Sequence, residues 1–406
     1  MTKREFSADL VIAGGGLVGL AMAGAVAGAG LTVVVVDPAQ PRALLDATFD
    51  GRASALAHAS QQLLRGIGVW PHLEADSQPI LDIRVTDGAS PLFLHYHHGD
   101  LGDEPFGVMA ENRHIRRALL AAARAQAGIT LLFGDRLAAT VRKAGGIEAQ
   151  TQRGARLRAR LVIGAEGRGS PLRTQAGIRT TGWSYGQTGI VTTVAHEDDH
   201  HGVAHERFLP AGPFAILPLP GRRCSLVWTE RYVVARAIMA LDDAAFAAEM
   251  GKRFGNFLGA VSPIGPRWSY PLGFMQAERY TARRLALIGD AAHGVHPVAG
   301  QGLNMGLRDV AALAEVLVEA HRLGLDIGAE AALQRFARWR RFDNMVMAAT
   351  MDGLVRLFSN DIAPVRAARR AGLAAVNRMA PLKRLFMRHA RGTVGKRPRL
   401  LTGAPL

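Results

Sequence analysis

Residues 289–309 read Gly-Asp-Ala-Ala-His-Gly-Val-His-Pro-Val-Ala-Gly-Gln-Gly-Leu-Asn-Met-Gly-Leu-Arg-Asp. This stretch follows an apolar run at 285–288 that is typical of a strand, and it leads into an Ala-, Leu- and Val-rich segment that predicts a helix over 309–323. Asp290 can accept hydrogen bonds from sugar or ribityl hydroxyls. The glycines let backbone N–H groups approach a ligand, and the start of a helix adds partial positive charge. The pattern therefore indicates a polar cofactor site; the alternative is an ordinary joint between a strand and a helix.

A second glycine-rich loop lies near the N-terminus, where residues 14–19 read Gly-Gly-Gly-Leu-Val-Gly and match G-x-G-x-x-G. Its surroundings predict a strand over 9–13, a helix over 16–29 and a second strand over 31–36. In this motif Gly14 serves the tight turn, Gly16 lets the backbone meet a pyrophosphate, and Gly19 permits close packing of helix and strand. Asp37 follows at the spacing expected of a carboxylate that binds an adenosine ribose. The N-terminal segment therefore predicts a dinucleotide site.

The same segment also contains a run without charged residues, from 10 to 36, which is longer than a bilayer requires. Its glycines, and its change from β-branched to Ala-rich and back to β-branched residues, favour a buried strand-helix-strand unit. Asp9 directly before the run argues against a secretory signal. We therefore expect no membrane span here.

Charge is distributed unevenly along the 406 residues, whose formal net charge is +15. Residues 354–406 contain twelve Lys or Arg and one acidic residue, so this segment carries +11 of the total. Interleaved Leu, Val, Met and Phe predict amphipathic helices. From composition alone, the partner of this segment is an anionic membrane surface, nucleic acid or only water. The single cysteine, Cys224, excludes an internal disulfide and is expected to be buried and inert.

The order of predicted elements indicates an α/β protein with two interleaved parts. A helix over 112–126 and a strand over 158–164 belong with the nucleotide unit, whereas 80–96 and 187–230 are rich in short strands typical of an antiparallel sheet. We therefore predict a Rossmann-like cofactor domain interleaved with an antiparallel β-sheet substrate domain and followed by C-terminal helices. The predicted bounds are 1–79, 108–178 and 276–345 for the cofactor domain, 80–107 and 179–275 for the substrate domain, and 346–406 for the basic helical region.

Three blocks now support a family resemblance. The glycine loop with Asp37 is followed by Gly164-Ala165-Glu166-Gly167-Arg168-Gly169-Ser170 and then by residues 289–309. Together they resemble the single-component FAD-dependent aromatic hydroxylases with the para-hydroxybenzoate hydroxylase fold, and residues 296–309 are similar to the signature of the ubiquinone-biosynthesis hydroxylases. The likeness covers essentially the whole chain. One departure is Glu166, because the family motif usually reads Gly-Ala-Asp-Gly. The further matching runs are Arg52-Ala53-Ser54-Ala55-Leu56, Glu111-Asn112-Arg113, Phe208-Leu209-Pro210 with Gly212-Pro213, Tyr270-Pro271-Leu272 and Arg399-Leu400-Leu401-Thr402-Gly403.

The resemblance implies FAD as the bound cofactor and NAD(P)H as a transient co-substrate. Asp37 would hold the adenosine ribose, Arg52 and Arg113 would lie along the flavin or its phosphates, and Asp290 would bind the ribityl or pyrophosphate-linked part. Glu166 belongs to a motif that the family links to both the flavin and NAD(P)H. The loop residues implied to hold FAD through their backbone are Gly14, Gly16, Leu17, Val18 and Gly19 at the pyrophosphate and Gly300, Gln301, Gly302, Leu303 and Asn304 at the isoalloxazine ring.

In such enzymes NAD(P)H reduces the flavin and leaves, and oxygen then forms a flavin hydroperoxide that passes a hydroxyl group to an electron-rich ring. The difficult chemistry belongs to the cofactor, so we nominate no nucleophile and keep His296, beside the flavin loop, as the one candidate catalytic side chain. Pro297 is expected to line the substrate pocket beside it. We assign four more pocket residues to one apolar strand face, although core packing would explain each of them equally well: Phe214, Ile216, Pro218 and Trp228.

The predicted function is therefore a flavin-dependent monooxygenase that hydroxylates the ring of a polyprenylated phenol in ubiquinone biosynthesis. Because such a substrate partitions into the bilayer, we expect a cytoplasmic protein held peripherally on the inner membrane face by its basic C-terminal region. Partners would include other ubiquinone-biosynthesis proteins and no nucleic acid. The histidines at 95–98 and 196–205 lack the spacing of a zinc site, so no metal is expected. The alternatives are a hydroxylase of a soluble aromatic acid, a flavin-dependent lipid reductase or dehydrogenase, and a nucleic-acid-binding flavoprotein.

Overall fold

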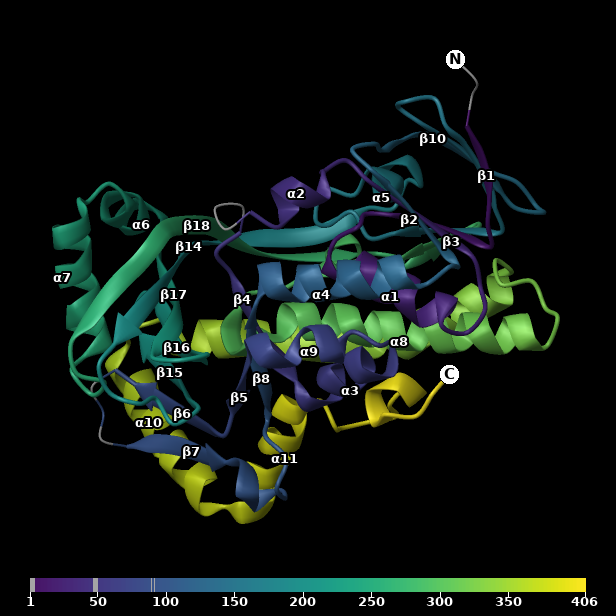
Figure 1. Cartoon of the computed structure of the whole chain (residues 1–406). Helices are drawn as coiled ribbons and strands as arrows, with labels where there is room; N and C mark the ends of the chain where they lie inside the picture. The colour runs from purple at the N-terminus through teal and green to yellow at the C-terminus, as the bar shows by residue number, and fades with distance from the viewer. Residues whose placement is uncertain (1–3, 47–49, 89, 91) are drawn as a thin grey trace.

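The computed structural model describes residues 4–46, 50–88, 90 and 92–406, and its four sheets and eleven helices are shown in Figure 1. The cofactor part contains a six-stranded sheet, which is parallel except for its first strand, and a four-stranded sheet beside it. The six-stranded sheet has the order β19 (Thr281–Ala282), β20 (Leu285–Leu287), β13 (Leu161–Gly164), β2 (Leu10–Ala13), β3 (Val33–Asp37) and β9 (Ile129–Phe133). The four-stranded sheet has the order β1 (Glu5–Ser7), β12 (Arg156–Ala159), β11 (Ile147–Thr151) and β10 (Leu137–Arg142).

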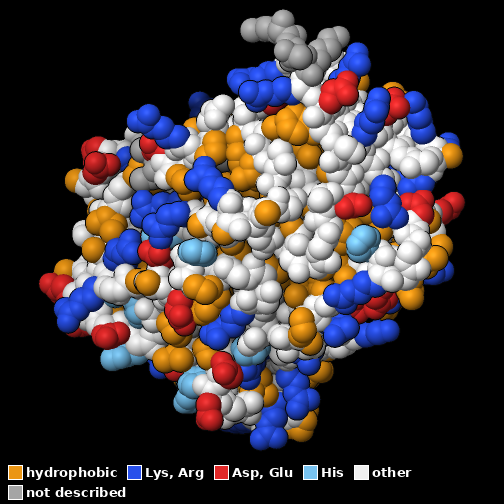
Figure 2. Space-filling view, turned by 45° about the vertical axis from the view of Figure 1, so that its right-hand side comes forward, with side chains coloured by type: hydrophobic (Ala, Val, Ile, Leu, Met, Phe, Trp, Pro, Cys, Tyr) orange, Lys and Arg blue, Asp and Glu red, His pale blue; other side chains and the backbone are white. Residues whose placement is uncertain are grey.

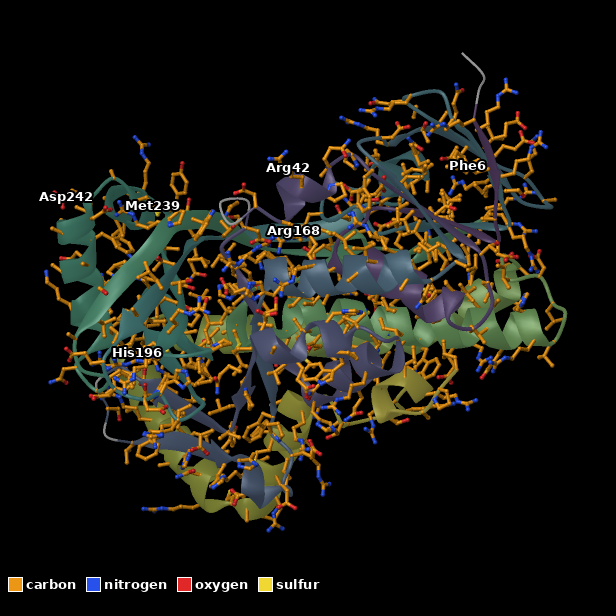
Figure 3. All side chains as sticks on the ribbon, in the orientation of Figure 1. Phe6, Arg42, Arg168, His196, Met239 and Asp242 are labelled. Atoms are coloured by element: carbon orange, nitrogen blue, oxygen red, sulfur yellow. The ribbon has the colours of Figure 1, made fainter. Side chains whose placement is uncertain are left out.

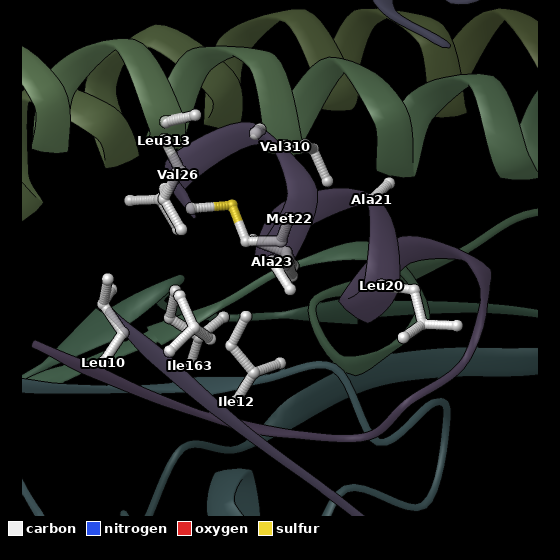
Figure 4. Close-up of a cluster of buried hydrophobic side chains, with 14 of the residues drawn as sticks. Leu10, Ile12, Leu20, Ala21, Met22, Ala23, Val26, Ile163, Val310 and Leu313 are labelled. Atoms are coloured by element: carbon white, nitrogen blue, oxygen red, sulfur yellow. The ribbon is translucent and has the colours of Figure 1, made fainter. Parts of the chain in front are cut away.

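The uncharged run near the N-terminus forms β2, helix α1 (Leu17–Ala27) and β3, which confirms the predicted strand-helix-strand unit. Helix α1 lies between the parallel sheet and helix α8 (Gln301–Arg322). Side chains of Ile12, Met22 and Val310 meet there in one apolar cluster (Figure 4). Residues 19–26 of α1 are all buried, which explains why this helix carries no charge. Helix α1 is therefore covered on both sides, as an α/β core requires.

The close approach of α1 requires glycine at two positions. A Cβ atom on Gly19 would lie 1.9 Å from the carbonyl oxygen of Gly14, and one on Gly306 would lie 2.8 Å from a methyl carbon of Val18. Gly306 explains why α8 begins at Gln301, eight residues before the predicted start at 309. The glycine-rich sequence looks like a loop, but part of it is helical, and Gly306 there serves helix packing. The strand predicted over 158–164 also differs, because the chain passes from β12 to β13 at Arg160 and so enters two sheets.

The substrate part is built on an eight-stranded sheet. Its neighbouring strands are antiparallel except for β15 and β6, which pair in parallel. Those two strands come from separate excursions of the chain, so no hairpin sets their direction, and the predicted all-antiparallel sheet is wrong at this one pair. The strand order is β21 (His293–Gly294), β18 (Val261–Ala277), β14 (Thr180–His196), β17 (Arg223–Arg231), β16 (Gly212–Leu219), β15 (Val203–Leu209), β6 (Asp82–Asp87) and β7 (Phe93–His97).

Smaller elements join the two parts. A three-stranded sheet, β4 (Ala53–Ala57), β8 (Gly107–Glu111) and β5 (Ser77–Ile80), leads from one part to the other. The helices of the cofactor part not yet named are α2 (Pro41–Leu44), α3 (His58–Gly66), α4 (Asn112–Ala125) and α5 (Pro171–Gln175). Helices α6 (Tyr232–Met239) and α7 (Asp243–Phe254) cover the outer side of the large sheet, at the left of Figure 1.

The basic C-terminal region is helical, as predicted, and packs against the substrate part. It contains α10 (Ala363–Arg378) and α11 (Ala380–Arg391), whereas the predicted boundary at 345/346 falls inside α9 (Glu330–Phe358). Figure 1 shows α10 beside β7, and a buried ion pair of 2.8 Å joins Arg369 to Asp87 at the end of β6. The last turn, Arg399–Thr402, returns to α3 and buries Leu400 and Leu401. This region is therefore integrated into the fold.

A buried carboxylate connects the flavin loop to the two long helices. Asp309 on α8 is fully buried and accepts hydrogen bonds from the backbone N–H of Gly289 at 3.1 Å and from Arg340 Nε at 3.0 Å. His293 Nε2 lies 2.5 Å from the same carboxylate, and Asn344 Nδ2 donates to it at 3.1 Å. Although burial opposes ionisation, His293 and Arg340 lower the pKa of Asp309 to about 2. The ionised group therefore binds the 289–294 loop to α8 and α9.

Asp309→Asn should lower the free energy of unfolding by about 3–5 kcal/mol, because Arg340 would remain buried without its main counter-charge. Urea denaturation at neutral pH measures the change. Glu319→Gln on the same helix is the control, since its pair with Arg335 is exposed and should contribute under about 1 kcal/mol. Equal losses in the two variants would contradict the role assigned to Asp309.

The stability of the protein should also depend on pH through Asp309. Because the pKa of Asp309 is lowered, its contribution to the free energy of unfolding should be present above pH 3.8 and disappear as the pH falls toward 2.

Candidate cofactor and substrate site

A large cavity of about 1490 Å³ lies between the cofactor part and the eight-stranded sheet. One end is lined by the N-terminal glycine loop and by the start of α8, whereas the other end is lined by apolar side chains of the sheet and of α9, α10 and α11. Its volume exceeds the 300–1,000 Å³ that is typical of a site for one small molecule. The cavity therefore has room for a cofactor and a second, apolar ligand.

The polar end of the cavity is formed by two helix N-termini. Gly16 is the N-cap of α1, and Gly300 is the N-cap of α8, and neither helix start has a side-chain cap. Residues following both caps line the cavity: Leu17, Val18, Gln301, Gly302, Leu303 and Asn304. Uncapped helix starts present backbone N–H groups and a partial positive charge. Two of them at one cavity favour a ligand with at least two anionic or electron-rich groups.

Glycine positions in these loops show where a ligand fits. A Cβ atom on Gly16 or on Gly302 would have no protein atom within 4 Å, although both residues line the cavity. A Cβ atom on Gly14 would lie 2.3 Å from the carbonyl oxygen of Ala165. Gly14 and Gly19 therefore shape the loop, whereas Gly16 and Gly302 leave space open toward the ligand. This is the division of roles expected of a dinucleotide loop.

A buried acid organises the basic side chains beside the glycine loop. Asp50 accepts hydrogen bonds from Arg52 Nε at 2.8 Å and from Asn112 Nδ2 at 3.3 Å, and Arg116 Nη2 lies 3.5 Å from it. Hydrogen bonds and the charge of Arg52 outweigh burial and lower the pKa of Asp50. The Arg52 guanidinium also lies over the Tyr270 ring, 4.9 Å from its centroid. Arg52, Asn112 and Arg116 all line the cavity and can reach a phosphate or a ring.

Three predicted cofactor residues with charged side chains lie outside the cavity lining, namely Asp37, Arg113 and Glu166. Arg113 pairs with Glu111 at 3.2 Å, and it is Arg116, one helical turn further along α4, that lines the cavity. Asn112 and Arg116 are four residues apart, so they lie on the same face of α4. This spacing is the sequence pattern that could have identified Arg116. Glu166 accepts hydrogen bonds from Ser170 Oγ at 2.6 Å and from the backbone N–H of Leu172 at 3.1 Å. Asp37 Oδ2 accepts from the N–H of Gly15 at 2.6 Å and so supports the loop.

Asp290 lines the cavity with its side chain about half exposed. Arg168 Nε lies 3.7 Å from its carboxylate, at the junction of the cofactor part and the large sheet (Figure 3). Asn304 also lines the cavity, but its amide is engaged by the protein. It accepts from Ser60 Oγ at 2.8 Å and donates to the carbonyl of Ala55 at 2.8 Å. The Asn304 side chain thus holds the start of α8 against β4 and leaves the backbone to face the cavity.

Four predicted pocket residues lie on the other face of the sheet. Phe214, Ile216 and Trp228 are fully buried in a cluster with Phe246 and Phe254 of α7, and Pro218 follows the same alternation. The cavity is lined by their neighbours instead: Pro213, Ala215, Leu217, Val227 and Thr229. Strand side chains alternate between the two faces of a sheet. The sequence pattern showed this alternation, but we assigned the wrong set of side chains to the cavity. Helices α6 and α7 cover the face that we expected to be open.

Pro297 lines the cavity as predicted, whereas His296 lies behind it. His296 Nδ1 accepts a hydrogen bond from the N–H of Val298 at 3.2 Å, and the ring packs edge-on against Tyr185 at 5.3 Å. Burial, and then the charge of Arg168, lower the pKa of His296 to about 4. The ring is therefore neutral at physiological pH, and its position favours support of the Pro297 turn.

The remaining predicted features have no catalytic geometry. Cys224 is buried, and burial raises its pKa to about 12, so it is an unreactive thiol. No group of three or more His, Cys, Asp or Glu side chains converges as metal ligands would in the part of the chain that the structure describes. Among the same residues, no helix combines the length and apolarity needed to span a bilayer.

These features fit FAD. The glycine loop and the start of α1 would hold its pyrophosphate, with Arg52 and Arg116 nearby, and Asp290 would meet its ribityl hydroxyls. The open space at Gly302 and the uncapped start of α8 would accommodate the isoalloxazine edge, where partial positive charge stabilises the ring as it gains electrons.

Gly16→Val should weaken FAD binding at least tenfold while leaving the unfolding of the apoprotein nearly unchanged, because its side chain would occupy ligand space. Gly19→Ala should instead destabilise the protein, since its Cβ meets the Gly14 carbonyl. Flavin fluorescence titration and thermal unfolding separate the two effects. Gly251→Ala on α7, where added atoms meet open space, is the control for both. A Gly16→Val protein with unaltered FAD affinity would contradict the placement of the pyrophosphate.

Comparison with known proteins agrees with FAD as the cofactor. A family model described as an FAD binding domain matches residues 7–327, and one described as squalene epoxidase matches residues 260–402. Solved structures of p-nitrophenol 4-monooxygenase PnpA from Pseudomonas putida and of PqsL from Pseudomonas aeruginosa share the fold. PnpA has a TM-score of 0.81 at 19% identity and covers 97% of this chain and 100% of its own. PqsL has a TM-score of 0.77 at 23% identity and covers 91% and 99%.

Sequence relatives are closer. Ubiquinone hydroxylase UbiL of Rhodospirillum rubrum is 56% identical over 402 residues, which span 98% of this chain and 94% of the relative. The 3-demethoxyubiquinol 3-hydroxylase of Escherichia coli is 36% identical over 386 residues, spanning 95% and 98%. These matches confirm the resemblance, the α/β fold class and FAD as the cofactor. The chain belongs to the FAD-dependent hydroxylases of ubiquinone biosynthesis, a family of flavin monooxygenases.

Proposed function

We propose that this protein hydroxylates the aromatic ring of a polyprenylated phenol, a precursor of ubiquinone, with NAD(P)H and O2 as co-substrates. The observation that carries the proposal is the shape of the cavity, which continues from the FAD end into an apolar end walled by α9, α10 and α11. A small, soluble aromatic acid would leave that apolar volume unfilled. An isoprenoid tail fills it and removes apolar surface from water.

The relatives support the same substrate class. The Rhodospirillum rubrum and Escherichia coli relatives are named for ubiquinone or a ubiquinol. The match to squalene epoxidase covers residues 260–402, which include the helices at the apolar end. Squalene is itself a long isoprenoid, which supports an isoprenoid tail as part of the substrate proposed for this chain.

The residues of this chain would bind the cofactor and the substrate, orient the substrate ring and exclude water. FAD, when bound, supplies the reduction by NAD(P)H and the transfer of one oxygen atom to the ring. The ring would lie between Pro297 with the start of α8 and the sheet residues Pro213, Ala215 and Val227, all of which line the cavity. Apolar walls keep water away from the reaction.

The direct test is turnover of the FAD-loaded protein with a phenol that carries two or more isoprene units. Hydroxylated product should form, with NAD(P)H oxidation that depends on oxygen and increases on adding the phenol. The isoprene-free compound 4-hydroxybenzoate is the matched comparison and should react at least tenfold less efficiently in kcat/KM. Preference for 4-hydroxybenzoate would favour the hydroxylase of soluble acids. Oxygen-independent turnover would favour a reductase or dehydrogenase.

We further propose that the protein binds the surface of an anionic membrane through α10 and α11, as a peripheral protein on the cytoplasmic face. Lys and Arg side chains gather at the lower end of the molecule in Figure 2, where Figure 1 places these helices. A hollow of about 360 Å³ there is lined by Arg384, Arg388 and Arg391 together with Asp100, and no described residue forms a hydrogen bond with the buried Arg391 Nε. Leu385 and Phe386 are exposed beside it, and Phe386 also lines the large cavity. The basic surface thus adjoins the apolar end of the cavity.

Arg384→Gln with Arg388→Gln should weaken binding to vesicles containing phosphatidylglycerol by about 30-fold, at roughly 1 kcal/mol for each charge near the surface. Removal of all residues after Asp361 would be unsuitable, because α10 and α11 also wall the cavity. Arg231→Gln with Arg236→Gln, beside and on α6, removes the same charge elsewhere and should leave vesicle binding unchanged. Vesicle sedimentation at low salt measures both pairs. Equal binding by the two double variants would overturn the proposed surface.

A further inference from the structure

Glu206 is a carboxyl group on an otherwise apolar part of the cavity floor. It lies in the middle of β15, and its partners across the sheet are Val85 on β6 and Ala215 on β16. All three residues line the cavity. Within the described parts of the chain, no hydrogen bond or ion pair engages the Glu206 carboxyl group. An acidic side chain is thus placed on the floor of the substrate cavity without a partner from the protein.

The direction of the Glu206 side chain follows from its strand. The His205 ring packs against Phe257 at 4.6 Å, and Arg207 Nη1 donates to the carbonyl of Phe254 at 2.8 Å, so these two side chains point to the opposite face of the sheet, although His205 also contributes to the cavity lining. Because strand side chains alternate, Glu206 faces the cavity, together with Ala204 and Phe208.

Among the residues that the structure describes, no charged group on the neighbouring elements compensates Glu206. The residues that share its face are apolar, namely Ile83 and Val85 on β6 and Ala215 and Leu217 on β16. Arg84 and Arg207 belong to the opposite face by alternation. Arg369 of α10, which also lines the cavity, is ion-paired with Asp87. Burial alone therefore raises the pKa of Glu206 to about 7.

A polar group in this position is costly unless a ligand supplies its partner. Glu206 is half-buried and faces the open cavity, so its carboxyl group loses water when an apolar ligand fills that space. Without a hydrogen bond this loss opposes binding, and Leu or Val at the same position would avoid it. A ring hydroxyl that enters an apolar cavity also loses its water. A hydrogen bond between the two groups would offset both losses, and sites of this kind discriminate strongly against ligands that lack the hydroxyl.

We propose that Glu206 is the polar anchor of the substrate: its carboxyl group forms a hydrogen bond with a hydroxyl group on the aromatic ring and so orients the ring, while the isoprenoid tail lies against α9 and α10. This inference rests on the proposed function and adds to it the residue that recognises the ring. Neutral Glu206 can donate or accept this bond. The ionised carboxylate accepts a stronger one, so affinity for a phenol should rise as the pH passes through about 7.

The test compares two probes, 2-geranylphenol and its methyl ether, which differ only in the hydroxyl group. Binding to the FAD-loaded full chain is measured as the change in flavin absorbance. The wild-type protein should bind the phenol roughly 10- to 100-fold more tightly than the ether, as expected for a hydrogen bond to an ionisable group. Glu206→Leu should abolish this preference. Glu206→Gln should keep most of it, because an amide also forms the bond, but should lose the rise in affinity between pH 6 and pH 8.

Ala215→Leu is the matched control, since it adds bulk to the same floor and keeps Glu206. It should weaken binding of both probes by the same factor and preserve the preference for the phenol. Thermal unfolding without ligand gives an independent readout. Glu206→Gln should raise the Tm relative to wild type at pH 8 and change it little at pH 4.5, because a raised pKa costs stability only where the group must ionise.

A wild-type protein that binds and hydroxylates the phenol, combined with a Glu206→Leu variant that keeps the phenol preference, would overturn this inference and leave the proposed function intact. A wild-type protein that binds neither probe would overturn both. Loss of the preference in Glu206→Leu together with its retention in Ala215→Leu is the supporting result.

Discussion

The ionised carboxylate of Asp309 is the interaction on which the site depends. The loop that presents Asp290 and Pro297 has little regular structure of its own, and it must keep one conformation beside a cofactor. Asp309 holds the start of that loop through the N–H of Gly289 and through His293, while Arg340 and Asn344 bind the same carboxylate from α9. The loop, α8 and α9 are therefore positioned by one buried charge and its donors. Because α9 continues into the wall of the cavity, the flavin end and the apolar end share this support.

The two ends of the cavity are lined by different kinds of group, which suit different parts of the bound ligands. At the flavin end, uncapped helix starts and the Asp50 cluster present N–H groups and guanidinium groups to an anionic ligand. At the other end, apolar side chains from the sheet and the C-terminal helices surround the remaining volume. The two environments meet at the sheet strands β15, β16 and β17, where a substrate ring would lie. A ligand with a polar head and an apolar tail matches this gradient along its whole length.

Local patterns predicted the cofactor end of the molecule well. Gly14, Gly16 and Gly19 belong to one short loop with a known spacing, so this spacing predicted both the fold and the ligand, although Gly14 also meets the distant carbonyl of Ala165. The substrate end could not be read in this way. Alternation along β16 defines two faces, but only α6 and α7, which are distant in the sequence, decide that Phe214 faces the core and Ala215 the cavity. For the same reason the choice between Arg113 and Arg116 depended on the rotation of α4 against the glycine loop.

The basic C-terminal helices also show how a pattern can have two uses. Their amphipathic character predicted a surface for a partner, and it did not reveal that much of the apolar face covers the protein's own cavity. This arrangement has a consequence for how the chain is made. The sheet floor and its apolar residues are synthesised before α10 and α11, so the apolar end remains open to water until those helices emerge from the ribosome. Until α10 and α11 are in place, the apolar residues of the sheet floor lack part of their cover, so closure of the substrate chamber depends on helices that follow every strand of the sheet in the sequence.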